Sequence, residues 1–458
     1  MLAMLARTSR IFVGEARGYT GVLRRYMSVS GRVIDIAAKD GELRVFVVSG
    51  EVSGDTIGAR LMASLKKMAP FPVKFSGVGG PMMSQKGLKS LFPMEDLAVM
   101  GIWELLPHLT RFRARLKETV KAALSFNPHV VVTVDSKGFS FRFLKQLRAT
   151  YSSQHLESPI HFHYVAPSFW AWRGGEARLK GLSRFVDHIF CILPFEEEVC
   201  RLNGLAATFV GHPVLEDCVE LNLGKRSIDW KIQTNSEDFR NKYDIPPGAH
   251  VILVLPGSRL QEVTRMFPIF LKTMELLKGS FPDLRTVMLV APNQHVESYI
   301  NTMLHHWPVP IALIPGSSAD LKYDAFSVCS AALCTSGTVA VEMQLARLPC
   351  LVAYRAHVLT EWFIRFKAKV KYISLPNILL NSCVIPEDLF DRCTPTNLAS
   401  SLMELIRDED QRRQQIKSAE KVIRLLCPPN SSVQNEWRRS PQPSIIAAST
   451  LLYYKWER

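Results

Sequence analysis

The sequence predicts an α/β protein built from two doubly wound domains, each with a parallel sheet covered by helices on both faces. Short runs of β-branched and other apolar residues end in glycine, serine, aspartate or proline and lead into amphipathic segments. This is the pattern of strands alternating with helices in a parallel sheet. A polar stretch near the middle of the chain interrupts the pattern, which then resumes. A chain of 458 residues is long enough for two domains of ordinary size.

The first domain is expected over residues 43–220. Residues 43–48, Leu-Arg-Val-Phe-Val-Val, have the composition of a buried strand, and residues 56–67 have apolar side chains spaced four apart, as in a helix. Asp55 directly precedes that helix and is expected to be its N-cap. The same alternation predicts further strands at residues 130–134, 161–165 and 188–193.

The second domain is expected over residues 248–426, after a polar linker at residues 221–247. Its strands are expected at residues 251–255, 286–290, 330–334 and 350–354. Residues 427–458 form a C-terminal tail to which the sequence assigns no structure. Because ligands of doubly wound sheets bind beyond the carboxyl ends of the strands, the loops of the two domains are expected to face a shared cleft.

The N-terminal 34 residues carry six arginines against one glutamate, with hydroxyl and apolar residues between them. This composition is typical of a mitochondrial transit peptide, and a disordered basic tail is the alternative. Residues 1–16 lack the continuous apolar segment of a secretory signal. We therefore expect residues 1–34 to be a transit peptide, and the protein to lie in the mitochondrion, on the matrix side and peripheral to the inner membrane.

The remaining composition limits the class of protein. The chain has no uninterrupted apolar run of about 18 residues, so contact with a membrane is expected to be peripheral. The nine cysteines include no CxxC pair, which argues against a structural zinc site and a disulfide framework and favours reduced thiols. The net charge of +14 would suit nucleic acid, but no recognition module is visible, and nucleic acid is not expected as a partner.

Two loops of the second domain have the residues of a phosphate site. In one of them, Thr335, Ser336, Gly337 and Thr338 lie where a strand ends and a helix begins. Free backbone N–H groups and the positive end of the helix dipole favour an anion at such a turn. Glu342, about one turn into the helix, could hold the hydroxyl pair of a ribose. The alternative is ordinary helix capping beside a solvated glutamate.

The other loop contains Gly257, Ser258 and Arg259. An arginine at this position could bridge two phosphate oxygens and stabilise charge on a departing diphosphate. A surface salt bridge is the alternative. The chain contains neither a GxxxxGK[ST] segment nor a GxGxxG turn after a strand, which argues against a P-loop nucleotidase and a dinucleotide oxidoreductase.

Carboxylates follow two strands of the first domain. Asp135 comes directly after residues 130–134, and Glu51 lies in the loop after residues 43–48. Transfer to a sugar hydroxyl requires a general base, because the hydroxyl is a weak nucleophile until its proton is removed. Asp135 and Glu51 are both candidates for this base.

Histidines give a weaker signal. His161 and His163 would share one face of a strand, but no third ligand has a suitable spacing, and core histidines are the favoured interpretation. No metal is expected. His212 follows a strand at the expected cleft edge and is the better candidate for a site.

Three segments combine aromatic and basic residues. Residues 168–173, Ser-Phe-Trp-Ala-Trp-Arg, could bind a sugar or an acyl chain, or could fill the domain interface. Residues 105–117 and 362–372 suit an anionic membrane surface, where aromatic side chains insert and cations meet phosphate headgroups. Solvated basic helices packed on their domains are the alternative.

Taken together, these loops resemble the lipid-A-disaccharide synthase family, which consists of inverting glycosyltransferases with the two-domain GT-B fold. The resemblance extends over residues 43–424. In the first domain it is carried by residues 50–55 (Gly-Glu-Val-Ser-Gly-Asp), 77–81 (Gly-Val-Gly-Gly-Pro), 98–102 (Ala-Val-Met-Gly-Ile), 168–173 and 193–196 (Leu-Pro-Phe-Glu). The later segments are residues 211–213 (Gly-His-Pro), 255–259 (Leu-Pro-Gly-Ser-Arg), 336–342 and 374–377 (Ser-Leu-Pro-Asn).

Membership implies transfer of 2,3-diacylglucosamine from its UDP derivative to the 6-hydroxyl of 2,3-diacylglucosamine 1-phosphate. The products are a β-1,6 disaccharide and UDP, and the family uses no metal or other cofactor. In the roles that the resemblance implies, Asp135 is the base, and Glu51 and Ser53 shape the acceptor side. The residues implied to bind the diphosphate, the nucleotide and the donor sugar are Gly257, Ser258, Arg259, Thr335, Ser336, Gly337, Thr338, Glu342 and Asn377.

The chain departs from the family in three places. After residue 424 the match fades, at the point where the family has final helices expected to pack back on the first domain. The family commonly reads Asp-Ala-Pro-Asp-Phe-Asn where residues 135–140 are Asp-Ser-Lys-Gly-Phe-Ser, so contacts around the acceptor are expected to differ. The N-terminal extension is absent from bacterial members and suits an organellar homologue in a plant-like cell. The sequence leaves a homodimer open.

Two other classes of function are the alternatives. Another UDP-sugar transferase or a UDP-sugar 2-epimerase of the same fold would keep the phosphate loops, and an epimerase would carry additional acid–base residues. A non-catalytic basic membrane-binding protein would explain the charge but not the carboxylates at the cleft.

Overall fold

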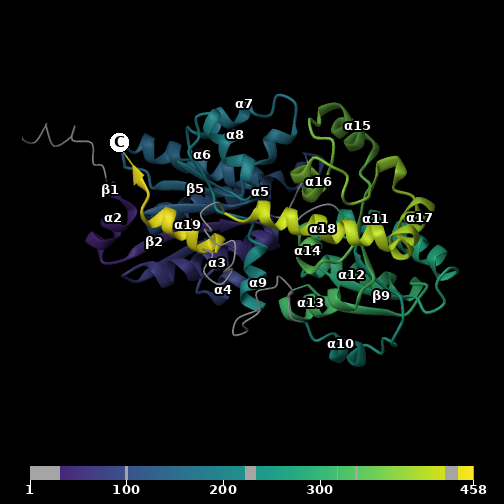
Figure 1. Cartoon of the computed structure of the whole chain (residues 1–458). Helices are drawn as coiled ribbons and strands as arrows, with labels where there is room; N and C mark the ends of the chain where they lie inside the picture. Colours follow the sequence, from purple (N-terminus) through teal and green to yellow (C-terminus); the bar gives the residue numbers. More distant parts are fainter. Residues whose placement is uncertain are drawn as a thin grey trace, which may run out of the picture.

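The computed structural model describes residues 31–97, 102–221, 234–316, 318–335, 339–428 and 442–456. In this part of the chain, two six-stranded sheets are formed, and all neighbouring strands within each sheet pair in parallel. Helices cover the sheets, which occupy separate halves of the molecule (Figure 1). The predicted α/β fold with two doubly wound sheets is confirmed.

The first sheet has the strand order β3-β2-β4-β5-β6-β7. The chain passes from β2 to β3 on one side and then crosses to β4 on the other, so the winding reverses between β2 and β4. The strands are β2 (Leu43–Ser49), β3 (Val73–Val78), β4 (Val130–Val134), β5 (Ile160–Tyr164), β6 (His188–Cys191) and β7 (Ala207–Phe209). The helices of this half include α3 (Val52–Met68), α4 (Pro81–Gln85), α5 (Ile102–Phe126), α6 (Lys137–Ser153), α7 (Ala177–Leu182), α8 (Pro194–Leu202) and α9 (Leu215–Leu221).

The second sheet repeats this plan with the order β10-β9-β8-β11-β12-β13, and its winding reverses between β8 and β11. Its strands are β8 (Val251–Leu255), β9 (Arg285–Val290), β10 (Ile311–Pro315), β11 (Ala331–Cys334), β12 (Cys350–Tyr354) and β13 (Glu387–Leu389). The helices of this half include α10 (Ser236–Lys242), α11 (Leu260–Lys278), α12 (Gln294–Met303), α13 (Ala319–Val328), α14 (Val339–Ala346), α15 (Val358–Lys367), α16 (Leu375–Leu380) and α17 (Pro395–Arg407).

The central strands form the cores of the two halves. All five residues of β4, Val-Val-Val-Thr-Val, are buried, and so are all five residues of β8, Val-Ile-Leu-Val-Leu. Strands covered by helices on both faces read as continuous apolar runs rather than alternating ones. The rigid cores therefore fix the positions of the loops that follow these strands.

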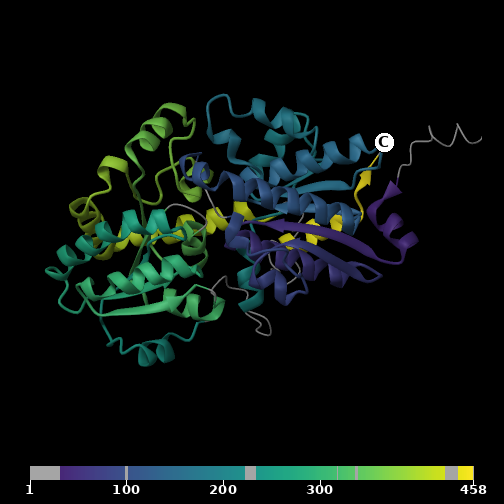
Figure 2. The same cartoon turned by 180° about the vertical axis from the view of Figure 1, so that it is seen from behind.

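The C-terminal segment returns to the first half of the molecule. From α18 (Glu409–Leu426) the chain leads to α19 (Pro443–Leu452), which packs against α3 (Figures 1 and 2). The backbone N–H and the hydroxyl of Ser444 donate to the buried carboxylate of Glu216 over 2.7 and 2.8 Å. The strand β14 (Lys455–Trp456) then pairs with β1 (Gly31–Arg32).

Some predicted features lie outside the described residues. They are residues 1–30 of the expected transit peptide, residues 98–101 of the family-like segment 98–102, residues 222–233 of the expected linker, and Ser336, Gly337 and Thr338 of the phosphate turn. Residues 31–34 of the expected transit peptide belong to β1 and α2 (Val33–Asp40), and Val33 is buried in the core of the first half. Among the described helices, none combines the length and the hydropathy that a transmembrane span requires.

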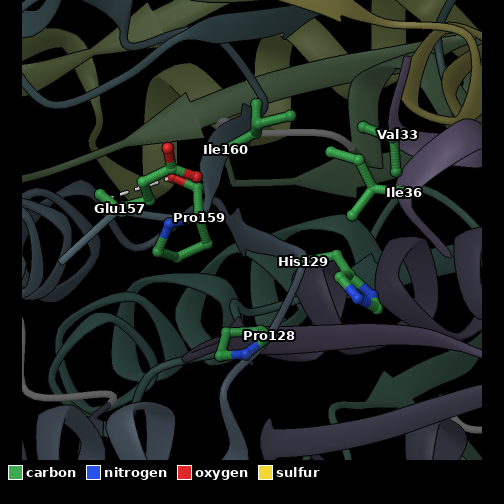
Figure 3. A pocket seen from close by; sticks show the side chains of 8 residues that line it. Val33, Ile36, Pro128, His129, Glu157, Pro159 and Ile160 are labelled. Atoms are coloured by element: carbon green, nitrogen blue, oxygen red, sulfur yellow. Dashed lines mark hydrogen bonds between the residues drawn. The ribbon is translucent and has the colours of Figure 1, made fainter. Parts of the chain in front are cut away.

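A small pocket lies at the amino ends of β4 and β5 (Figure 3). Within it, Nδ1 of His129 accepts a hydrogen bond from the backbone N–H of Arg44, and Nε2 lies 2.9 Å from Asp40. The pocket therefore lies at the amino edge of the sheet. Ligands of such sheets bind at the carboxyl edge, so the candidate site lies on the opposite edge.

Candidate active site

The carboxyl edges of both sheets carry predicted site residues where the winding reverses. Glu51 follows β2 and Asp135 follows β4, while Arg259 follows β8 and Thr335 follows β11. These reversal points are where doubly wound sheets bind their ligands. The two loops of each half therefore lie next to each other although they are far apart in sequence.

Asp135 lies on a strained turn. It and Ser136 have φ angles of 50° and 46°, so two consecutive residues other than glycine adopt the left-handed conformation. The backbone N–H of Asp135 donates to the carbonyl of Tyr164 over 2.9 Å, and its carbonyl accepts from the Ser140 hydroxyl over 2.8 Å. Each left-handed residue costs about 1–3 kcal/mol, and such strain is concentrated at functional sites. The hydrogen bonds hold the strained turn in place.

Asp135 and Glu51 affect each other electrostatically. Burial raises the pKa of the Asp135 carboxyl, and the Ser136 N–H and the charges of Arg259 and Lys137 oppose this shift. Burial and then the charge of Asp135 raise the pKa of Glu51, against the effect of Arg259. A raised pKa makes a carboxylate a stronger base at neutral pH.

Arg259 connects the two halves of the molecule. Its Nη2 donates to Oε2 of Glu51 over 2.9 Å. The other oxygen, Oε1, is buried and has no hydrogen-bond partner among the described residues. The salt bridge that the sequence left as an alternative for Arg259 is therefore present, with a partner in the opposite half.

The loops after β2 and β4 approach each other closely. A Cβ atom at Gly50 would lie 2.6 Å from the hydroxyl oxygen of Ser136, so only glycine fits there. Ser53 lies half-buried in the first turn of α3, beside Glu51. This packing sets the position of Glu51 relative to Asp135.

The expectation for Asp55 is wrong. Helix α3 begins at Val52 rather than at residue 56, with Glu51 in the N-cap position, so Asp55 lies within the first turn. Its buried carboxylate instead accepts the backbone N–H groups of Gly80, Met82 and Met83 over 2.9, 2.9 and 3.0 Å. Asp55 therefore caps α4, and the sequence did not reveal this because α4 is far away along the chain.

The two phosphate loops of the second half share a partner that the sequence did not reveal. Glu262, in the first turn of α11, accepts the backbone N–H of Ser258 over 3.2 Å and a hydrogen bond from the Thr335 side chain. A side chain at Gly257, which has a φ of 122°, would collide with its carboxylate. Burial raises the pKa of Glu262. Its place three residues after the N-cap of α11 is the position of the glutamate in a capping box, which was the available signal.

Glu342 is part of a charged network between the halves. Its Oε2 lies 3.1 Å from Nζ of Lys322, which also lies 3.4 Å from Oδ2 of Asp217. Asp217 accepts further hydrogen bonds from Arg60 over 2.7 Å and from the Tyr323 hydroxyl over 2.8 Å. Burial raises the pKa of Glu342, and the charge of Lys322 opposes this shift. Lys322 thus fixes the carboxylate that the sequence predicts for ribose binding.

Asn377 is fully buried, and its amide is used within its own loop. Its Oδ1 accepts the N–H groups of Val384 and Ile385 over 2.9 Å each. Its Nδ2 donates to the carbonyl of Ile385 and to Glu387 over 2.8 Å each. Asn377 therefore orders this loop, and a direct contact with the donor would require these bonds to be exchanged.

The three histidines that the sequence singled out are buried within the first half. His161 and His163 are fully buried, as the favoured interpretation predicted, and burial lowers the pKa of His163 to about 3. His212 is also buried, and its backbone N–H donates to Leu426 over 3.0 Å, so it does not open onto a cleft. Across the described ranges, no group of three or more His, Cys, Asp or Glu side chains is placed to hold a metal ion.

The aromatic loop at residues 168–173 contacts the second half. The N–H of Arg173 donates to the carbonyl of Lys367 over 2.8 Å, and Trp172 lies 5.9 Å from Phe363, centroid to centroid. The indole N–H of Trp170 donates to the buried carboxylate of Glu196 over 3.0 Å. The loop therefore fills the interface between the halves, one of the alternatives that the sequence left open.

Comparison with known proteins places the chain among related sequences. The model of the family described as lipid-A-disaccharide synthetase matches residues 45–438. A protein of Arabidopsis thaliana named "Probable lipid-A-disaccharide synthase, mitochondrial" is 61% identical over 440 residues, which cover 94% of this chain and 95% of the relative. The lipid-A-disaccharide synthase of Rhodospirillum centenum is 42% identical over 384 residues, covering 84% and 90% of the two chains.

Solved structures share the fold. A UDP-GlcNAc 2-epimerase of Methanocaldococcus jannaschii in complex with UDP-GlcNAc and UDP has a TM-score of 0.52 at 10% identity, covering 84% of this chain and 99% of its own. The kitacinnamycin glycotransferase has a TM-score of 0.52 at 13% identity, covering 90% and 98%. At such low identity the likeness shows the GT-B fold alone. From the family match and the two sequence relatives, the chain belongs to the lipid-A-disaccharide synthase family of glycosyltransferases.

Proposed function

We propose that this chain transfers 2,3-diacylglucosamine from its UDP derivative to the 6-hydroxyl of 2,3-diacylglucosamine 1-phosphate. The acceptor oxygen forms a bond to the anomeric carbon of the donor while the bond from that carbon to the diphosphate breaks, with inversion. The proton of the hydroxyl passes to a base of the enzyme, and UDP leaves with the bonding electrons. The observation that carries this proposal is the meeting of Asp135, Glu51 and Arg259 where the winding of the two sheets reverses, in a chain of this family.

Asp135 is the base in this proposal. Its pKa is raised by burial, and it has no cation bonded to its carboxylate in the way that Glu51 is bonded to Arg259 among the described residues. A carboxylate held by an arginine is a weaker base, because the cation stabilises its ionised form. The strained turn keeps the carboxylate of Asp135 at the sheet edge, where an acceptor hydroxyl would arrive.

Arg259 changes partners during the reaction. In the structure its guanidinium is bonded to Glu51, and 48% of its side chain is exposed. The donor diphosphate would compete with Glu51 for this cation, because arginine binds phosphate oxygens in a bidentate manner. Glu262 supports both phosphate loops, and Glu342, held by Lys322, would accept the ribose hydroxyls.

Peripheral contact with a membrane is part of the same proposal. On α15, Trp362, Phe363 and Phe366 are 67%, 50% and 57% exposed, and the rings of Trp362 and Phe366 stack with centroids 5.8 Å apart. Residues 361–372 carry four basic side chains against one acidic side chain. Exposed aromatic rings among cations suit the interface of an anionic bilayer, in which acylated substrates reside. The name of the Arabidopsis relative and the arginine-rich N-terminus support the mitochondrion as the location. Within it, in this proposal, the chain lies on the matrix side of the inner membrane.

The reaction is tested by incubating the full chain with UDP-diacylglucosamine and diacylglucosamine 1-phosphate in detergent micelles. Mass spectrometry of the lipids then follows the acylated disaccharide, and UDP is measured in parallel. We expect disaccharide and UDP in equal amounts. UDP without disaccharide, or a 2-epimer of the donor sugar, would contradict the proposal.

A further inference from the structure

Two cations of the first half lie over the same aromatic ring, one of them close to the candidate base, and neither has a part in the proposed reaction. Lys137 begins α6, two residues after Asp135, and its ammonium nitrogen lies 5.8 Å from the centroid of the Phe169 ring. Arg178, on α7, places its guanidinium carbon 5.7 Å from the same centroid. Both side chains are exposed, and within the described ranges neither has a carboxylate at ion-pair distance.

Lys137 and Arg178 are both positively charged and repel each other. Partial desolvation lowers the pKa of Lys137, and the charge of Arg178 adds to this effect, whereas Asp135 acts against it. Like charges held near each other are unfavourable, so an anion bound by both would remove the repulsion. The arrangement is that of an anion site on the first-domain side of the catalytic carboxylates.

The neighbouring backbone is open to such an anion. A Cβ atom added at Gly138 would meet only Arg142, at 3.8 Å, so the first turn of α6 is not covered there. The helix has 17 residues, and its N-terminal N–H groups and dipole favour a negative charge. The family motif cited above has proline where this chain has Lys137, so the lysine belongs to the departure that was expected to change acceptor contacts.

We propose that Lys137 and Arg178 bind the phosphate group of the acceptor, a sugar 1-phosphate, an inference that rests on the proposed function. The reaction brings two phosphate-bearing groups into the cleft. The donor diphosphate belongs to the second-domain loops and Arg259, whereas the acceptor hydroxyl must reach Asp135 in the first domain. The acceptor phosphate therefore requires cations on the first-domain side, and Lys137 and Arg178 both lie near the Phe169 ring there.

The test compares two acceptors, diacylglucosamine 1-phosphate and the same lipid without its phosphate. Binding of each in detergent micelles is measured by calorimetry with the full chain, and kcat/KM is measured for transfer to each. We expect Lys137→Gln and Arg178→Gln each to weaken binding of the phosphorylated acceptor roughly 10- to 100-fold, the usual effect of losing a hydrogen bond to a charged group. Binding of the acceptor without phosphate should stay unchanged.

Two exposed lysines serve as matched controls. Lys145→Gln on α6 and Lys180→Gln on α7 remove the same charge from the same helices and should keep the wild-type preference. Lys137 also acts on the pKa of Asp135, and a change in this pKa alters kcat with both acceptors alike. The ratio of kcat/KM for the phosphorylated acceptor to kcat/KM for the acceptor without phosphate therefore reports the phosphate contact alone.

Equal binding of both acceptors by the wild type would overturn the proposal. A ratio of the two affinities that stays at the wild-type value in both Lys137→Gln and Arg178→Gln would also overturn it. The calorimetric measurement requires no turnover. A chain that prefers the phosphorylated acceptor through Lys137 and Arg178 but makes no disaccharide would support this inference and contradict the proposed function.

Discussion

Arg259 and Glu51, 208 residues apart in sequence, are joined by a hydrogen bond of 2.9 Å between Nη2 and Oε2. Glu51 follows the first strand of one parallel sheet, and Arg259 follows the first strand of the other. The bond therefore connects the two halves of the molecule at the edge where both sheets carry their candidate site residues. It also pairs the cation predicted for the donor diphosphate with a carboxylate next to the candidate base.

Replacing Arg259 should reduce transfer strongly. Arg259→Met removes the cation for the departing diphosphate and leaves Glu51 without its partner, so we expect kcat to fall roughly 10²- to 10³-fold. Arg259→Lys keeps the charge but loses the planar fork and should recover only part of the rate. In a double-mutant cycle with Glu51→Gln, the two losses should not be additive, because the residues are in contact. Wild-type kcat in Arg259→Met would contradict this role.

Lys322 should be needed for stability as well as for donor binding. Its side chain is 12% exposed and lies between Asp217 and Glu342, which are 10% and 21% exposed. Lys322→Met leaves two largely buried carboxylates without this cation, so we expect the free energy of unfolding in urea to fall by about 3 kcal/mol and the donor KM to rise. Lys322→Arg should restore most of the free energy of unfolding and most of the affinity for the donor. The exposed Lys272→Met is the matched control, and equal stability of the two methionine variants would refute the prediction.

Glu196 should make stability depend on pH. Burial raises the pKa of this carboxyl from 4.5 to about 7, against the effect of the Trp170 hydrogen bond. The folded state therefore binds the proton more tightly than the unfolded state, and stability is lost as the pH rises from about 4.5 to about 7. The linked free energy is about 3 kcal/mol over this range.

Thermal denaturation between these pH values checks this prediction. In Glu196→Gln, stability should fall less steeply with rising pH than in the wild type, because the contribution of Glu196 is gone. The variant Glu198→Gln, at an exposed neighbour, should keep the wild-type dependence of stability on pH. Parallel curves for the wild type and Glu196→Gln would show that Glu196 does not titrate in this range.

Asp55 should affect stability and not chemistry. Asp55→Ala leaves the N–H groups of Gly80, Met82 and Met83 without their acceptor, and we expect a loss of about 2–3 kcal/mol in the free energy of unfolding. The folded fraction should keep the wild-type kcat. A folded Asp55→Ala protein with a kcat lowered 100-fold or more, roughly the effect of losing a general base, would instead place Asp55 in the catalytic machinery.

The fold could be predicted from the sequence because the signals are local. Runs such as Val-Val-Val-Thr-Val in β4 identify buried parallel strands, and the residues directly after them, such as Asp135, must lie at the carboxyl edge of the sheet. The positions of Asp135, Glu51 and Arg259 followed from this rule alone.

Contacts between distant segments could not be predicted in this way. No local pattern indicates that Glu51 pairs with Arg259, that Lys322 bridges Asp217 and Glu342, or that α19 packs against α3. The family resemblance implies that Asn377 contacts the donor, yet its amide is saturated by its own loop. Such pairings depend on how the two halves meet and on loop conformation, which single-residue properties do not determine.

The most direct test of the account compares Asp135→Asn with Glu51→Gln in the disaccharide assay. Both variants remove one negative charge with little change in shape, and circular dichroism verifies that each is folded. If Asp135 is the base, Asp135→Asn should lower kcat roughly 10²- to 10⁴-fold, while Glu51→Gln keeps substantial activity. Wild-type activity in Asp135→Asn together with loss of activity in Glu51→Gln would contradict the account and assign the base to Glu51.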